Sequence, residues 1–117
     1  MATYNGGRFL KKQLDSILSQ SLKPSEIIIC DDGSTDDTIN IIRGYPAESN
    51  IRLIVNDKNL GYIKNFEKAI SLCSHPLIAL SDQDDIWHIN KLKILTDEIG
   101  NNLAIFSNMT LIDDNDL

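Results

Sequence analysis

The feature that most constrains the fold is a run of four apolar residues, 27–30, that ends abruptly at Asp31-Asp32-Gly33. A continuous apolar run is typical of a strand that is covered on both faces. Apolar residues recur at helical spacing before it, over residues 7–20, and after it, up to Gly44. A buried strand between two amphipathic helices favours an α/β protein with a parallel sheet.

The same alternation continues along the rest of the chain. We predict strands at 51–55, 77–80 and 103–106, and a further helix at 91–99. Another helix follows the turn at 59–61, and its inward face is marked by Ile63, Phe66, Ala69, Ile70 and Cys73. Parallel strands need crossover connections, which place helices on the faces of the sheet. The pattern therefore predicts a mostly parallel sheet with helices on both faces.

The ends of the pattern look incomplete for a whole domain. The chain opens on a turn and a helix with no strand in front of them, and residues 113–117 are polar directly after a predicted strand. We therefore expect one domain, residues 1–117, that is a fragment truncated at both ends. A lost sheet strand would leave an unpaired edge, so we also expect self-association through that edge.

Charge and cysteine usage limit the function classes. Lys and Arg total 11 against 17 for Asp and Glu, which gives a net charge of −6. This balance argues against nucleic-acid binding, because that function needs a basic face. Cys30 and Cys73 fit neither a disulfide framework nor a zinc spacing, and no signal peptide opens the chain. We expect a cytoplasmic protein.

An acidic segment, residues 81–85, carries the sharpest chemical signal. In extended backbone, residues two apart point to the same side, so Asp82 and Asp84 can face one site. Paired carboxylates suit Mg²⁺ or Mn²⁺, which keeps open positions for phosphate oxygens. On spacing alone, the favoured alternative is a solvated acidic turn in which Asp85 caps the next helix.

A second polar cluster follows the first apolar run. In open parallel sheets, ligands bind beyond the carboxyl ends of the strands, where Asp31 and Asp32 are expected to lie. An acid there can accept a hydrogen bond from a base N–H or a ribose hydroxyl. The alternative is a strand-to-helix turn with Gly33 in a left-handed conformation and Ser34 capping the following helix. Spacing alone favours the turn.

Four segments together closely resemble family 2 glycosyltransferases, in the right order and over nearly the whole chain. They are Ala2-Thr3-Tyr4-Asn5, residues 26–36, Asn59-Leu60-Gly61 and residues 79–87. The acidic segment that ends in Ile86-Trp87 is most similar to bacterial enzymes that build cell-surface polysaccharides, some of them rhamnosyltransferases.

This resemblance implies a GT-A fold, a Rossmann-like nucleotide-sugar-binding domain. It implies transfer of a sugar from a UDP- or dTDP-linked donor to a glycan or lipid-linked acceptor, with inversion. The general base is expected beyond Leu117, so this chain would bind the donor and transfer nothing alone. The whole enzyme is expected in the cytoplasm, with the inner membrane face as a second location.

The resemblance also assigns roles to individual residues. Tyr4 and Asp32 would contact the nucleobase, and the backbone near Ala2 and Thr3 would line the same pocket. Asp82 would lie near the ribose and the metal. Asp84 would coordinate Mg²⁺ or Mn²⁺ in a DXD-type motif.

One departure from the family pattern concerns the helix after the glycine turn. Many family members carry an Arg-Asn pair where this chain has Phe66 and Glu67, so a phosphate contact from this helix is not expected.

Two other protein classes share some of these features. A signalling receiver domain is also doubly wound and binds Mg²⁺ through acids, but it relies on a lysine after a later strand. Here Ser107-Asn108 follows the last predicted strand. A metal-dependent phosphotransferase needs Thr or Val two residues after the second Asp of its motif, where this chain has Ile86.

Overall fold

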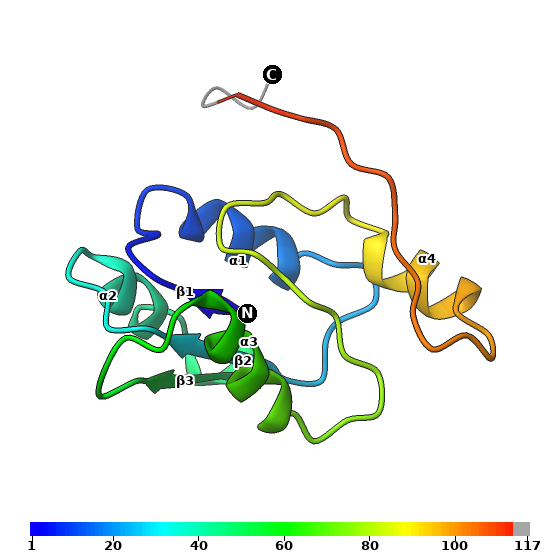
Figure 1. Ribbon diagram of the computed structural model, residues 1–117. Helices are drawn as coiled ribbons and strands as arrows, with labels where there is room; N and C mark the ends of the chain where they lie inside the picture. Colours follow the sequence, from blue (N-terminus) through cyan, green and yellow to red (C-terminus); the bar gives the residue numbers. More distant parts are fainter. Residues whose placement is uncertain (114–117) are drawn as a thin grey trace.

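The computed structural model describes residues 1–113, which form a small parallel sheet between helices (Figure 1). In chain order the elements are β1 (Ala2–Thr3), α1 (Leu10–Leu18), β2 (Ile27–Asp31), α2 (Thr38–Arg43), a short 3₁₀ helix (Ala47–Ser49), β3 (Ile51–Val55), α3 (Tyr62–Ser71) and α4 (Lys91–Glu98). The strand order is β1-β2-β3, and both pairings are parallel.

The first strand corrects the prediction that no strand precedes the first helix. Ala2 pairs with Cys30 and Thr3 pairs with Asp31. The Cys30 N–H donates to the Met1 carbonyl at 3.1 Å, which extends the pairing toward the N-terminus. β1 has only two residues, too few for an apolar period, so the pattern could not reveal it.

The central strand β2 is buried along its whole length, as the apolar run predicts. Ile27 and Ile29 face a core shared with Leu10, Leu14 and Ile17 of α1, Ile42 of α2 and Trp87. Ile28 and Cys30 face the opposite side, where they pack with Ala69 of α3. The two sets alternate with the period of two that a strand dictates. Helices therefore cover both faces, as expected.

Two predicted strands, 77–80 and 103–106, are not formed. Their apolar side chains are exposed instead: Leu77 is 56% exposed and Phe106 is 91% exposed. A strand is stabilised by the backbone of a neighbouring strand, and neither segment has such a neighbour among residues 1–113. Figure 1 shows the chain after α4 running away from the sheet as an extended segment.

Smaller corrections concern the helix faces and starts. Ile63 is 66% exposed, because Asn65 and Ala69 form the inward face of α3. Ser34 caps no helix, since α2 begins at Thr38, whose N–H donates to the Asp36 carboxylate at 3.0 Å. The helix predicted at 7–20 forms as α1 over a shorter range.

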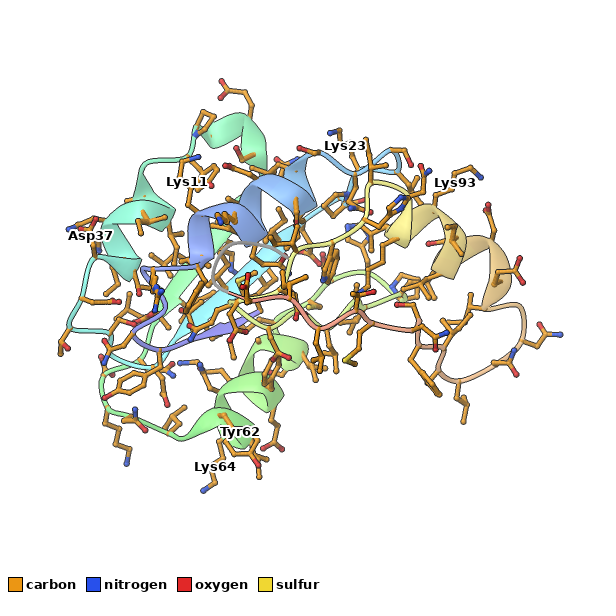
Figure 2. All side chains as sticks on the ribbon, turned by 90° about the horizontal axis from the view of Figure 1, so that it is seen from above. Lys11, Lys23, Asp37, Tyr62, Lys64 and Lys93 are labelled. Atoms are coloured by element: carbon orange, nitrogen blue, oxygen red, sulfur yellow. The ribbon has the colours of Figure 1, made fainter. Side chains whose placement is uncertain are left out.

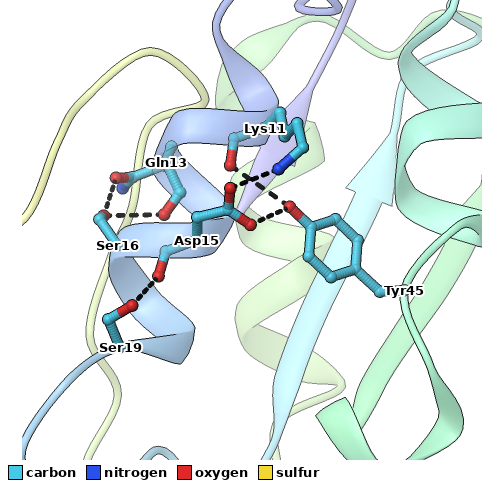
Figure 3. A network of polar contacts seen from close by, with 6 residues as sticks. All are labelled: Lys11, Gln13, Asp15, Ser16, Ser19 and Tyr45. Atoms are coloured by element: carbon cyan, nitrogen blue, oxygen red, sulfur yellow. Dashed lines mark hydrogen bonds and ion pairs between the residues drawn. The ribbon is translucent and has the colours of Figure 1, made fainter.

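Exposed lysines lie on the outer faces of three helices. Lys11, Lys64 and Lys93 are exposed on α1, α3 and α4 respectively (Figure 2). On α1, the Asp15 carboxylate accepts from Lys11 Nζ at 2.6 Å and from the Tyr45 hydroxyl at 2.7 Å (Figure 3). The Lys11 and Tyr45 bonds hold the pKa of Asp15 below its usual value. This network ties α1 to the segment that follows α2.

Within residues 1–113, no helix combines the length and the apolar character needed to cross a membrane.

Candidate functional site

Three turns meet at the carboxyl end of the sheet, and Gln83 joins two of them. The Tyr4 N–H donates to Gln83 Oε1 at 2.9 Å, and Gln83 Nε2 donates to the Tyr4 carbonyl at 3.2 Å. A Cβ atom on Gly6 would lie 2.3 Å from Gln83 Oε1, so any other residue at this position would displace the Gln83 side chain. The side chain of Gln83 thus attaches the acidic segment beside the end of β1.

The turn after β1 is also bonded to the turn after β2. The Asn5 N–H donates to Ser34 Oγ at 2.9 Å, and the Thr35 N–H donates to Asn5 Oδ1 at 2.8 Å. Asn5 has a φ of 47°, a left-handed conformation that asparagine tolerates better than most residues. These reciprocal bonds hold the two turns together.

Asp31 builds the turn after β2. It is fully buried, and its carboxylate accepts from Thr3 Oγ1 at 2.7 Å, from the Ser34 N–H at 2.8 Å and from Ser34 Oγ at 2.6 Å. Gly33 adopts a φ of 84°, which confirms the predicted left-handed turn. The Ser34 hydroxyl serves this turn in place of the predicted helix cap.

Asp32 is 3% exposed and faces the turn after β3. Its Oδ1 accepts from Asn56 Nδ2 at 2.8 Å and from the Leu60 N–H at 2.7 Å, and its Oδ2 accepts from the Gly61 N–H at 2.8 Å. Burial alone would raise the pKa of Asp32, but these bonds and the charge of Lys68 hold it below its ordinary value. A charged Asp32 therefore fixes the turn at 59–61.

The acidic segment is anchored at both ends in the folded core. Ser81 and Trp87 are 5% and 6% exposed. The Gln13 side chain lies between them: its oxygen accepts from Ser81 Oγ at 2.7 Å and from Trp87 Nε1 at 3.2 Å, and its nitrogen donates to the Asp85 carbonyl at 2.8 Å. The sequence analysis did not predict this anchor. The signal for it was a polar residue, Gln13, on the inward face of α1.

The carboxylates between these anchors are exposed and repel one another. Partial desolvation of its carboxylate and the neighbouring charges of Asp85 and Asp84 raise the pKa of Asp82. Asp85 does not cap the next helix, because α4 begins at Lys91, beyond Asn90. The predicted cap is therefore wrong, whereas the predicted solvated turn is confirmed, because Asp82, Asp84 and Asp85 are exposed.

The acidic segment supplies oxygen ligands of the kind that the predicted Mg²⁺ or Mn²⁺ needs. Among residues 1–113, no group of three or more His, Cys, Asp or Glu side chains is arranged to hold an ion. Mg²⁺ is commonly bound by one or two carboxylates together with substrate phosphates and water. Asp82 and Asp84 fit that mode, and their mutual repulsion is what a cation would relieve.

The structure brings most of the predicted site residues to one edge of the sheet. Ala2 and Thr3 form β1, Tyr4 follows it, and Gln83 joins Tyr4 to the segment that carries Asp82 and Asp84. Asp32 stands apart from this contact, behind the turn at 59–61. Their roles toward a ligand stay predictions. Sequence reasoning placed Gln83 in the acidic segment but gave it no role, and it missed Asn56 and Asn65, because amide side chains carry no distinctive spacing.

The chain is similar in sequence to known glycosyltransferases. Residues 1–116 match the family described as Glycosyl transferase family 2. The chain is 44% identical over 100 residues to the dTDP-rhamnosyl transferase RfbG of Shigella flexneri, covering 80% of this chain and 34% of that protein. It is 40% identical over 95 residues to the putative glycosyltransferase EpsE of Bacillus subtilis, again covering 80% of this chain and 34% of the relative.

Solved structures agree with the sequence relatives. The crystal structure of S. aureus TarS residues 1–349 in complex with UDP superimposes with a TM-score of 0.77 at 26% identity, covering 84% of this chain and 30% of the TarS chain in that crystal. A complex of the same TarS region with UDP-GlcNAc also gives 0.77. The chain thus spans about a third of these relatives, and neither the receiver nor the phosphotransferase alternative is favoured. It belongs to glycosyltransferase family 2 and has the GT-A fold.

Proposed function

We propose that the whole protein transfers a sugar from a nucleotide-diphosphate donor to a glycan or lipid-linked acceptor during synthesis of a bacterial cell-surface polysaccharide, with inversion. Family membership and relatives such as RfbG and the WfgD glucosyltransferase of Escherichia coli support this proposal. Residues 1–117 are the nucleotide-sugar-binding domain, and the general base lies beyond Leu117. This region therefore binds the donor without transferring the sugar.

The observation that carries the proposal is the double hydrogen bond between Gln83 and the Tyr4 backbone. It joins the residue expected at the nucleobase to the segment expected at the diphosphate. Tyr4 is 49% exposed, so its ring is free to stack on a base, and the backbone of Ala2 and Thr3 lies next to it. One donor molecule would span these neighbouring elements.

Asp84, with Asp82, would hold Mg²⁺ or Mn²⁺ in this proposal. The acidic segment would repel a diphosphate on its own, because the charges of Asp82, Asp84 and Asp85 already oppose one another. A divalent cation offsets that repulsion and stabilises a departing diphosphate. The chain's part is to hold the two carboxylates at a fixed place beside β1.

Calorimetric titration of UDP and dTDP, with and without Mn²⁺, tests the proposal. We expect binding that depends on Mn²⁺, and the preferred nucleotide will narrow the class of sugar. Asp84→Asn should weaken Mn²⁺-dependent binding at least about tenfold, as expected for loss of one charged interaction. Asp97→Asn on α4 is the matched control and should bind like the wild type. Equal affinity in Asp84→Asn would remove Asp84 from the site, and absence of binding by the wild type would overturn the donor-site proposal.

We also propose that the chain self-associates through an open sheet edge. Among residues 1–113, β1 and β3 each pair with β2 alone, so the outer edge of each lacks a strand neighbour. Such edges favour pairing with another copy. Light scattering should show a species larger than the monomer. A monodisperse monomer across the accessible concentration range would contradict it.

The proposed location is the cytoplasm, at the inner membrane face for the whole protein. Cys30 and Cys73 are free thiols, which suits a reducing compartment. Cell fractionation that recovers the whole protein beyond the inner membrane would contradict this location.

A further inference from the structure

A buried polar network lies directly behind Asp32. It consists of Asn56 after β3, which is 6% exposed, and Asn65 on α3, which is 1% exposed, together with Lys68 one turn further along α3. Buried amides and charges are costly unless every polar atom finds a partner. Here hydrogen bonds connect Lys68 and Asn65 of α3 through Asn56 to the Asp32 carboxylate.

Asn56 stands at the centre of the network, and its orientation is fixed from both sides. Its Oδ1 accepts from Lys68 Nζ at 2.7 Å, while its Nδ2 donates to Asp32 Oδ1 at 2.8 Å and to Asn65 Oδ1 at 2.8 Å. A flipped amide would turn its NH₂ group toward the ammonium and its oxygen toward the carboxylate. Lys68 therefore selects the orientation that donates to Asp32.

Asn65 ties the same network to the central strand. Its Nδ2 donates to the Cys30 carbonyl of β2 at 2.8 Å, two residues before Asp32. The amide of Asn56 is thus held against both the sheet and α3. A rigid donor on a rigid frame can fix the rotamer of the carboxylate that it bonds.

The two oxygens of Asp32 are used unequally. Oδ1 accepts two hydrogen bonds, from Asn56 Nδ2 and the Leu60 N–H, whereas Oδ2 accepts one, from the Gly61 N–H. A carboxylate oxygen has capacity for about two such bonds. Oδ2 therefore keeps an unused lone pair, on the residue expected at the nucleobase.

We propose that Asn56, oriented by Lys68, is a positioning residue that fixes Asp32 so that Oδ2 accepts a hydrogen bond from the ring N–H of a pyrimidine nucleotide. This inference rests on the proposed donor-binding function. It assigns to Lys68 a role in base recognition without contact with the base. Asp32 is the group that touches the ligand, and the network holds the Asp32 side chain in one rotamer.

The test compares UDP with N3-methyl-UDP, which lacks the ring N–H. A hydrogen bond to a charged group contributes about 1.5–3 kcal/mol, so the wild type should prefer UDP by roughly 10- to 100-fold. Lys68→Met should reduce this preference to below about threefold, and Lys68→Arg should restore it. Lys64→Met, an exposed lysine of the same helix, should leave it unchanged. Both ligands are titrated into the same sample, so partial unfolding of a variant cancels in the ratio.

A measurement without nucleotide separates this inference from the donor-binding proposal. Both Asn56 amide protons have acceptors, so NMR should show them exchanging slowly with solvent in the wild type and at least about tenfold faster in Lys68→Met. Fast exchange in the wild type would overturn the network. An unchanged preference for UDP in Lys68→Met would overturn the positioning role while leaving donor binding intact. Failure of the wild type to bind either UDP or dTDP would overturn both proposals.

Discussion

Residues 1–73 and residues 74–113 follow the same alternating sequence pattern, yet they differ sharply in how well their apolar side chains are covered. In the first region β2 is buried throughout and two helices share its core. In the second region Leu77, Leu103 and Phe106 are 56%, 105% and 91% exposed. An apolar pattern therefore indicates which element a segment can form, and the presence of a neighbouring strand decides whether a strand forms.

The acidic segment lies in the second region but is held by the first. Gln13 bonds to Ser81 and Trp87, Trp87 packs in the core with α1, and Gln83 bonds to the Tyr4 backbone. Lys91 adds a cation–π contact 4.7 Å from the centre of the Trp87 ring. The candidate site is therefore fixed even though the predicted strand before it is not formed.

The largest effect on stability is expected from a Leu→Ala substitution in the first region, and the same substitution in the second region serves as its comparison. Leu14→Ala removes a fully buried side chain of α1 and should lower the free energy of unfolding by about 2–5 kcal/mol. Leu103→Ala should change it by less than about 0.5 kcal/mol, because Leu103 is fully exposed. Urea denaturation measures both. Similar losses in the free energy of unfolding of the two variants would contradict the difference in packing between the two regions.

Trp87→Phe tests whether the acidic segment depends on the core of the first region. The change removes an indole N–H that donates to Gln13 and leaves a gap among buried residues. We expect a loss of about 1–3 kcal/mol in the free energy of unfolding, together with weaker Mn²⁺-dependent nucleotide binding. Ile89→Val, at an exposed position, is the control. Full stability combined with weakened binding would show that Trp87 acts on the ligand directly.

Gln83→Glu tests how much the hydrogen bonds between Gln83 and the Tyr4 backbone stabilise the fold. The glutamate keeps an acceptor for the Tyr4 N–H but cannot donate to the Tyr4 carbonyl, and it adds a charge beside Asp82 and Asp84. We expect thermal unfolding to report a loss of about 0.5–1.5 kcal/mol. Asn101→Asp adds the same charge at an exposed turn and should be neutral. Wild-type stability in Gln83→Glu would show that the segment is held by its anchors alone.

Tyr45→Phe gives the smallest effect and carries a pH signature. The Tyr45 hydroxyl helps to hold the pKa of Asp15 low, after the Lys11 bond. A carboxyl with a lowered pKa in the folded state stabilises the protein above its unfolded-state pKa, and that contribution disappears as the pH falls through the lowered value. We expect a deficit of at most about 0.5–1 kcal/mol at pH 7, since Asp15 is exposed.

That deficit should shrink on acidification. Tyr62→Phe, at a position that is 75% exposed, is the matched control for loss of a phenol hydroxyl. Denaturation curves at pH 7 and at pH 3 supply the comparison. A deficit that stays constant between the two pH values would mean that the Tyr45 hydroxyl does not act through Asp15.

Local patterns predicted the elements whose partners are present. The four apolar residues before Asp31 gave β2, and the spacing of Leu10, Leu14 and Ile17 gave α1, because both signals depend on a face that is buried in this structure. The strands at 77–80 and 103–106 depend on non-local pairing, which a single segment cannot encode.

The residues of the candidate site divide in the same way, into those that a local pattern indicates and those that depend on distant contacts. Acidic residues after strands indicated Asp32, Asp82 and Asp84, because carboxylates beyond strand ends are a recognisable pattern. The amides of Gln83 and Asn56 depend on contacts across 79 and 24 residues of sequence respectively. Such contacts are visible only after the chain has folded, so the sequence could name the acids but not the groups that hold them.

We propose that the turns after β1 and β2 and the acidic segment form one metal-dependent nucleotide site. Paramagnetic broadening by Mn²⁺ in the NMR spectrum of the chain, with and without UDP, tests it most directly. We predict that with UDP the amide signals of Tyr4, Gly33 and residues 82–85 broaden together, while those of α4 stay sharp. Broadening that is confined to one segment, or that is the same without UDP, would contradict a shared site.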